Sequence, residues 1–153
     1  MHMTTPITLA CISLVAVLVG CAADDGGNRD SFIEIDLKAV DHVGGFANAY
    51  LTPQGDMTGL SVIVAGPPPS TTRPVHLYTY IHSGSCERLS DQPKYSLNDR
   101  VSTSNENNQL WRYSRSVPAP LSELRSGSHA IVIHSAPSDG NKRLFCGDIP
   151  VAD

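Results

Sequence analysis

Two histidines that each end a β-strand pattern, His82 and His134, are the residues of this chain best placed to do chemistry. A cysteine follows each of them along the chain, Cys86 after the first and Cys146 after the second. Imidazole suits copper and zinc, so two histidines on neighbouring strands could hold part of a metal site. The residues leave one alternative open, in which both imidazoles are polar groups hydrogen-bonded across a sheet.

The segment 73–86 positions the first of these histidines. Its β-branched and aromatic residues, followed by a turn of small residues, predict a strand. Because successive side chains of a strand point to opposite faces, His82 shares its face with Tyr80, which could ligate a metal weakly. His76 lies on the same face but about 20 Å from His82 at the rise of a strand, too far to share one ion unless the strand bends.

The second histidine ends the segment 128–134, whose apolar residues also predict a strand. A further predicted strand, 143–149, follows it and carries Cys146. In a regular strand His129 faces the opposite way from His134, and we therefore expect its side chain to be exposed to solvent.

The rest of the chain shows short strand patterns separated by turn and loop signals. Further strands are expected at 31–38, 46–52, 57–65, 95–103 and 109–117, with a polar stretch at 87–94 and a single helical turn at 118–127. About seven or eight short strands with almost no helix predict an all-β fold, a Greek-key antiparallel β-sandwich or flattened barrel.

The first 20 residues differ in kind from the rest, because they are apolar and carry no charged side chain. The uncharged stretch is short for a membrane span and is typical of a signal peptide. It ends in Leu18-Val19-Gly20-Cys21, which resembles the bacterial lipobox, and the resemblance implies that Cys21 becomes the lipidated first residue of the mature chain. The residues before it depart from the usual signal in carrying no Lys or Arg, and an ordinary secretory signal or an uncleaved anchor is the alternative.

The domain organisation follows from this start. Residues 21–30 are polar and predict a flexible tether, and residues 31–153 are enough for one β-sandwich domain. The lipid anchor would hold the chain on a membrane of the bacterial cell envelope, facing the periplasm or the exterior. The net charge of -4 argues against nucleic acid as a partner, and the sequence names no protein or small-ligand partner.

Cysteine usage fits the same compartment. Once the signal is removed and Cys21 is lipidated, Cys86 and Cys146 remain as one pair where disulfides form. A bridge that closes a loop of about 60 residues would stabilise the fold by about 4 kcal/mol through loop entropy. Two free thiols are the alternative.

Three motifs together resemble the copper,zinc superoxide dismutase superfamily and related small secreted bacterial proteins of the CHRD type. They are residues 80–86, 130–134 and 140–149. The resemblance implies that His82 and His134 match two copper ligands and that Arg143 matches the residue that guides the anion. It also implies a disulfide between Cys86 and Cys146.

The chain departs from that pattern in its metal ligands. Tyr80 stands where the first histidine of the pair is expected, and no histidine lies between Cys86 and Gly127 to match the bridging ligand. Two imidazoles are too few to hold a catalytic copper ion through both of its oxidation states. We therefore expect no catalytic residue, no cofactor and a binding or structural role. The alternative is a copper-binding or weakly redox-active protein that uses a residual site at His82, His134 and Tyr80.

Overall fold

A computed structural model describes residues 32–40, 44–66, 71–106 and 110–152. The predicted signal peptide, the lipidation at Cys21 and the tether of residues 21–30 lie outside the described residues. The strands are β1 (Ile33–Ala39), β2 (Phe46–Gln54), β3 (Met57–Ala65), β4 (Tyr78–Ser85), β5 (Arg88–Ser96), β6 (Ser104–Glu106), β7 (Leu110–Val117), β8 (His129–His134) and β9 (Arg143–Ile149). A four-residue helix, α1 (Leu121–Leu124), and a 3-10 turn, η1 (Pro137–Asp139), complete the described elements.

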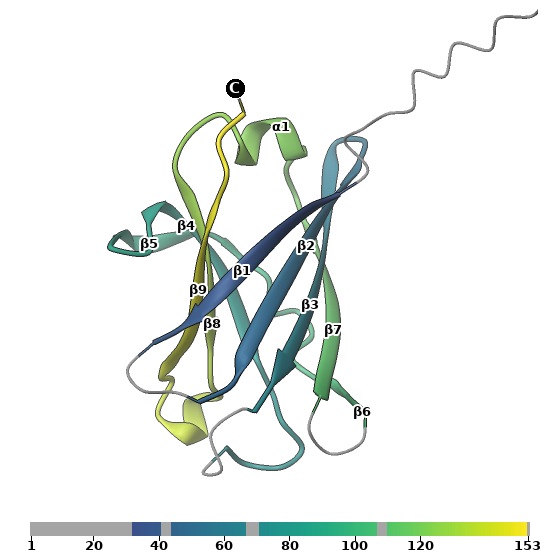
Figure 1. Cartoon of the computed structure of the whole chain (residues 1–153), viewed down its shortest axis with the longest axis vertical. Helices are drawn as coiled ribbons and strands as arrows, with labels where there is room; N and C mark the ends of the chain where they lie inside the picture. Colours follow the sequence, from purple (N-terminus) through teal and green to yellow (C-terminus); the bar gives the residue numbers. More distant parts are fainter. Residues whose placement is uncertain (1–31, 41–43, 67–70, 107–109, 153) are drawn as a thin grey trace, which may run out of the picture.

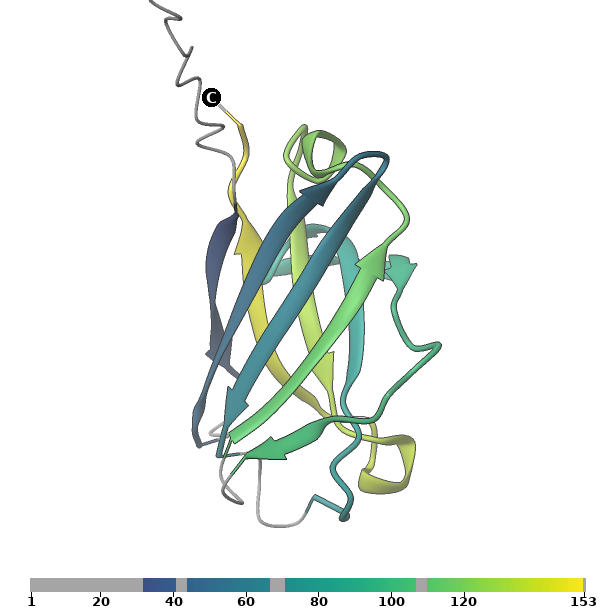
Figure 2. The same cartoon turned by 90° about the vertical axis from the view of Figure 1, so that its right-hand side faces the viewer.

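The strands form one antiparallel sheet in the order β5-β4-β8-β9-β1-β2-β3-β7-β6. The sheet curls over on itself, so that β1, β2, β3 and β7 form one layer and β4, β8 and β9 the other (Figures 1 and 2). Strand β1 joins the layers, because it pairs with β2 over most of its length and with β9 at Lys38 and Ala39. Strands far apart in sequence become neighbours, as in Greek-key connections. The predicted all-β fold is confirmed, with nine strands in the described residues.

The hairpin of β2 and β3 shows why these residues form strands. Its alternating small and aliphatic residues point inward, and Leu51 pairs with Leu60 at the centre of the register, both fully buried. The turn between the strands contains Gly55, whose positive φ of +67° suits glycine. The strands predicted at 46–52 and 57–65 are therefore confirmed, and they pair as a hairpin.

The main hydrophobic core lies between the two layers. Its largest fully buried side chains include Phe145, Leu77, Ile81, Ile131 and Ile133. On the outer side of the β4-β8-β9 layer a second, smaller cluster contains Ala130, Val132 and Cys146, with Val40, Cys86 and Leu89 packed against it. Both faces of β8 are thus buried, which explains its unbroken run of buried residues.

Strand β5 corrects the sequence prediction. The polar stretch 87–94 is the body of this strand, whereas the strand expected at 95–103 ends at Ser96. Among the described strands, β5 is at the edge of the sheet and pairs with β4 alone, so both of its faces are largely exposed and it needs no apolar alternation. Strand β4 also begins later than expected, at Tyr78, because only the isolated bridge between His76 and Ser102 precedes it.

Helix α1 confirms the single helical turn expected within 118–127. It buries Leu121 and Leu124 over one end of the core. Among the described residues there is no helix with the length and apolar character needed to cross a membrane.

Candidate functional site

The predicted site residues meet on the outer face of the β4-β8-β9 layer. In the register of β4 and β8, Tyr80 lies opposite Val132 and His82 lies opposite Ala130. His134, at the other end of β8, lies opposite Arg143 on β9. Strand pairing therefore brings the two histidines, the tyrosine and the arginine to one face.

His82 is half-buried beneath the hairpin of β4 and β5. Its Nδ1 atom donates a hydrogen bond to the backbone carbonyl of Ser90 at 2.9 Å. Because a carbonyl accepts and cannot donate, this contact places the proton of the neutral imidazole on Nδ1. The Nε2 atom is then the nitrogen with a free lone pair.

His134 is held in the same way at the opposite end of the site. Its Nδ1 atom donates to the backbone carbonyl of Asn141 at 3.1 Å. Burial lowers the pKa of His134, the hydrogen bond to Asn141 opposes that shift, and the nearby His82 and Arg143 lower the pKa further. The imidazole is therefore neutral at pH 7.

The ring of Tyr80 lies between the two imidazoles. Its centroid is 6.3 Å from the ring of His82 and 5.3 Å from that of His134, and both contacts are edge-on. His134 is four residues along β8 from the position opposite His82, a rise of about 13 Å. A shared ion needs a nitrogen of each ring within about 2 Å of one point. Tyr80 lies between the two imidazoles, and the Nδ1 atom of each is hydrogen-bonded to a different backbone carbonyl.

The described residues offer no larger metal cluster. No three His, Cys, Asp or Glu side chains among them come together as ligands of one ion. A shared metal at His82 and His134 stays a prediction.

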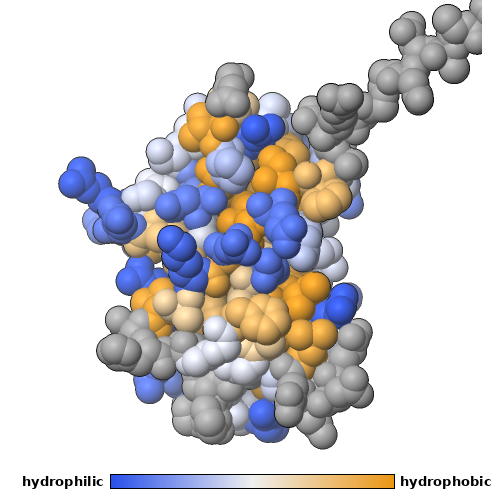
Figure 3. All heavy atoms as spheres, viewed as in Figure 1, coloured by the Kyte–Doolittle hydropathy of each residue, from blue (hydrophilic) through white to orange (hydrophobic). Residues whose placement is uncertain are grey.

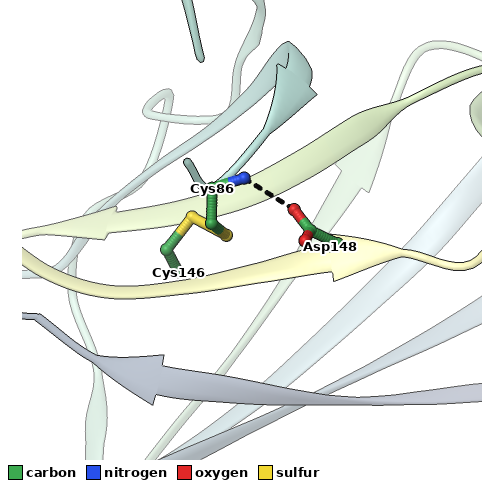
Figure 4. Close-up of a disulfide and its surroundings, with 3 residues drawn as sticks. All are labelled: Cys86, Cys146 and Asp148. Atoms are coloured by element: carbon green, nitrogen blue, oxygen red, sulfur yellow. Dashed lines mark hydrogen bonds between the residues drawn. A yellow bond between two sulfur atoms is a disulfide. The ribbon is translucent and has the colours of Figure 1, made fainter. Parts of the chain in front are cut away.

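The disulfide predicted between Cys86 and Cys146 is confirmed. Its sulfur atoms are 2.10 Å apart, and it links the residue after β4 to the middle of β9. Figure 4 shows Asp148 beside it, with Oδ1 accepting a hydrogen bond of 2.7 Å from the backbone N–H of Cys86. This carboxylate and the sulfur bridge together fix the end of β4 to β9. The alternative of two free thiols is therefore wrong.

Arg143 lines a cleft of about 610 Å³ beside the disulfide. Lys38 is the second cation of its lining, and the acidic side chains there are Glu34, Asp36, Glu87 and Asp148. Carboxylates outnumber cations in this cleft, which opposes the approach of an anion. The role of Arg143 in guiding an anion stays a prediction that its surroundings do not favour.

Two carboxylates of this cleft also join a hydrogen-bond network on the outer face of β1 and β2. Asn48 Nδ2 donates to Glu34 at 3.1 Å and to Asp36 at 2.9 Å, and the Tyr50 hydroxyl donates to Glu34 at 3.0 Å. Figure 3 shows hydrophilic residues across the middle of the face that these strands present. The network raises the pKa of Tyr50, chiefly through its hydrogen bond to Glu34.

His129 is buried, at 6% exposure, and the expectation that it faces solvent is wrong. It does face away from His134, but that side of β8 is the interior, which α1 closes at this end. Its Nδ1 atom donates to the carbonyls of Leu124 at 3.0 Å and Gly127 at 3.2 Å. The ammonium of Lys94 lies 3.3 Å from Nε2 and donates to it.

Lys94 connects this histidine to an exposed polar cluster that the sequence did not reveal. Its ammonium pairs with Glu123 at 2.9 Å, and the Tyr95 hydroxyl donates to the same carboxylate oxygen at 2.6 Å. These hydrogen bonds lower the pKa of Glu123, with Tyr95 as the larger cause. The cluster ties the edge strand β5 to α1.

Comparisons with known proteins add no relative. A scan against protein-family models and searches of curated proteins and of solved structures returned no match. The resemblance to the superoxide dismutase superfamily therefore stays a prediction.

Proposed function

We propose that the chain is a lipoprotein of the bacterial cell envelope whose β-sandwich has a binding or structural role. Residues 1–20 direct export, Cys21 carries the lipid, and residues 21–30 let the domain stand off the membrane. The disulfide between Cys86 and Cys146 is the observation that carries this proposal, because such bridges persist in oxidising compartments outside the cytoplasm.

Lipid labelling of the full chain in a bacterial host tests the anchor. A Cys21→Ser variant is expected to lose both the incorporated radiolabelled fatty acid and recovery in the membrane fraction. Cys11→Ser is the matched control, because it removes a cysteine from the same signal and leaves the lipidation site intact. Equal labelling of the Cys21→Ser variant and the wild-type chain would refute the anchor.

The non-catalytic role rests on the geometry between β4 and β8. Tyr80 separates His82 from His134, and each imidazole is engaged with a backbone carbonyl. The outer face of the β4-β8-β9 layer is suited to holding the β4–β5 hairpin in place and to presenting aromatic and polar groups. Kinship with the superoxide dismutase superfamily is part of the proposal. The disulfide between Cys86 and Cys146, which the resemblance to that superfamily implied, supports this kinship.

A copper-binding role is the second candidate, and one feature favours it. A carbonyl bonded to Nδ1 of each histidine orients the ring and leaves Nε2 as the donor, as outer-sphere partners of metal ligands do. Rotation of the Tyr80 ring would open the space between the two Nε2 atoms.

Copper loading of the full chain separates the two candidates. The proposed role predicts no copper retained after dialysis against a weak chelator, in the wild-type chain and in a His82→Ala, His134→Ala double variant alike. Stoichiometric copper that the double variant loses, and that a His76→Ala control keeps, would establish the metalloprotein instead.

A further inference from the structure

A second cleft, which none of the predicted site residues lines, has a volume of about 620 Å³. It lies where the edge of the β2-β3-β7 layer meets the segment that follows β5. Its polar lining residues include Ser61, Ser114 and Ser116, and its charged lining residues are Asp99, Arg100 and Arg115.

Arg115 occupies a position in β7 that faces the core. In the sheet register it lies opposite Leu60, which in turn lies opposite Leu51, and both leucines are fully buried. A strand alternates between its faces, so Arg115 points to the same side as the buried Tyr113 and Val117. A cation thus stands in a row of apolar side chains.

The guanidinium of Arg115 is only partly satisfied. Its Nη1 atom donates to the carbonyl of Ser114 at 2.8 Å, and its Cζ atom lies 4.4 Å from the centre of the Tyr113 ring. Its Nε and Nη2 atoms are both buried and have no hydrogen-bond partner among residues 32–40, 44–66, 71–106 and 110–152. A buried, unpaired donor on a charged group lowers the stability of the fold. A hydrogen-bond acceptor placed at this edge of the guanidinium would therefore be stabilising.

The described residues supply no anion to meet this edge. No carboxylate in the described part of the chain forms an ion pair with Arg115, although Asp99 belongs to the same lining. Burial raises the pKa of Tyr113, so its hydroxyl stays protonated and shares a hydrogen bond of 2.9 Å with Thr79. Arg100 adds a second positive charge that acts on Arg115.

We propose that this cleft binds the oxyanion group of a small ligand, a carboxylate or a phosphate, through the Nε and Nη2 atoms of Arg115. These two nitrogens form the edge of a guanidinium that meets two oxygens of one anion in a planar, bidentate pair. Arg100 contributes long-range attraction for the anion. The site depends neither on the lipid anchor nor on the histidine face.

Binding requires a local movement, because Nε and Nη2 are covered in the free protein. Asp99 and Arg100 are exposed and lie outside the strands, so they are the part of the lining that can shift most easily. The movement would bring the anion next to the ring of Tyr113, whose side-chain signals then report on binding.

Titration of the full chain with sodium phosphate and with sodium acetate, at an ionic strength matched with sodium chloride, tests the site. Two readouts are followed: the melting temperature, and the NMR signal of the Arg115 side-chain Nε–H. We expect a saturable rise in melting temperature and a saturable shift of that signal with at least one of the two anions. The anion that binds more tightly tells whether a carboxylate or a phosphate is preferred.

Arg115→Met removes the charged fork and keeps an unbranched side chain. We expect it to weaken anion binding at least about tenfold, since a charge-assisted pair is lost, without lowering the melting temperature in chloride. Arg88→Gln is the control, because it removes the same charge at the exposed start of β5, and it is expected to bind as the wild-type chain does. If Arg115→Met fails to fold, Arg115→Lys and the wild-type NMR titration decide the matter.

Asp99→Asn tests whether the carboxylate of Asp99 competes with the bound anion for Arg115. Tighter anion binding in this variant is expected, because a competing carboxylate is removed from the lining. The proposal is overturned if neither anion shifts the Arg115 Nε–H signal saturably, or if Arg115→Met or Arg115→Lys binds the anion as tightly as the wild-type chain.

Discussion

At the scale of single residues, the environment of a side chain departs from what its strand position alone suggests. His129 and Arg115 both face the interior, yet one is satisfied by two carbonyls and an ammonium while the other keeps two unpartnered nitrogens. Polar groups of the first kind stabilise a fold, and those of the second kind mark a place where a ligand can act.

His134 makes stability depend on pH. Its pKa is lowered in the folded chain, chiefly by burial, so between that value and about 6.5 the unfolded chain binds more protons than the folded one. The contribution of His134 to the free energy of unfolding should therefore be complete above about pH 6.5 and should be lost as the pH falls through the folded pKa. Urea denaturation between pH 5 and pH 8 measures this slope.

A matched pair of variants assigns the slope to this residue. His134→Gln can still donate to the carbonyl of Asn141 and does not titrate, so it should flatten the slope. His76→Gln, which makes the same substitution at a histidine outside the site, is the matched comparison. The assignment fails if both variants keep the wild-type pH dependence.

At the scale of elements, strands with one buried face were predictable and the edge strand was not. The hairpin of β2 and β3 alternates because one face enters the core, whereas β5 is stabilised by its backbone ladder to β4 and by contacts of Lys94 and Tyr95. In the sequence, the inward positions of β7 include Trp111, Tyr113 and Val117. A charge at the intervening position 115 was the signal that could have identified the second cleft.

The β4–β5 hairpin depends on Gly84. This glycine has φ of +96°, and a Cβ atom built on it would lie 2.1 Å from the backbone carbonyl oxygen of Arg88. Gly84→Ala should therefore lower the free energy of unfolding by about 2 kcal/mol or more, because the strain of a positive φ adds to a steric clash with the backbone of Arg88. Urea denaturation measures the change.

Gly55→Ala is the control for backbone strain alone. Its φ is +67°, but a Cβ atom there would meet nothing within 4 Å, so the expected loss is about 1 kcal/mol. Equal losses in the two variants would show that the close approach of Arg88 does not matter to the hairpin.

At the scale of the whole molecule, the sequence predicted which residues share the site but not how they meet. The pairing of Cys86 with Cys146 followed from counting cysteines and from the resemblance, and the structure contains it. The position of Tyr80 between the two imidazoles depends on the register of β4 against β8, which is set by packing of both strands into a common core. That register decides whether the histidines can share an ion.

The disulfide has a global effect that reduction should reveal. It joins residues with a sequence separation of 60, and the loss of this closed loop should lower the free energy of unfolding by about 4 kcal/mol through the entropy of the unfolded chain. A Cys86→Ala, Cys146→Ala double variant removes both thiols, so neither forms a wrong bridge. Its urea midpoint, compared with that of the oxidised wild-type chain, measures the loss.

Asp148→Asn separates the covalent constraint from the contact beside it. This variant keeps the disulfide and weakens only the hydrogen bond from the Cys86 N–H, so it should cost about 1 kcal/mol. The loop-closure entropy of the disulfide acts on the unfolded chain. The Cys86→Ala, Cys146→Ala double variant should therefore unfold at a lower urea concentration while its native contacts stay intact. A double variant as stable as the wild-type chain would mean that β4, β8 and β9 hold together through their ladders and core alone.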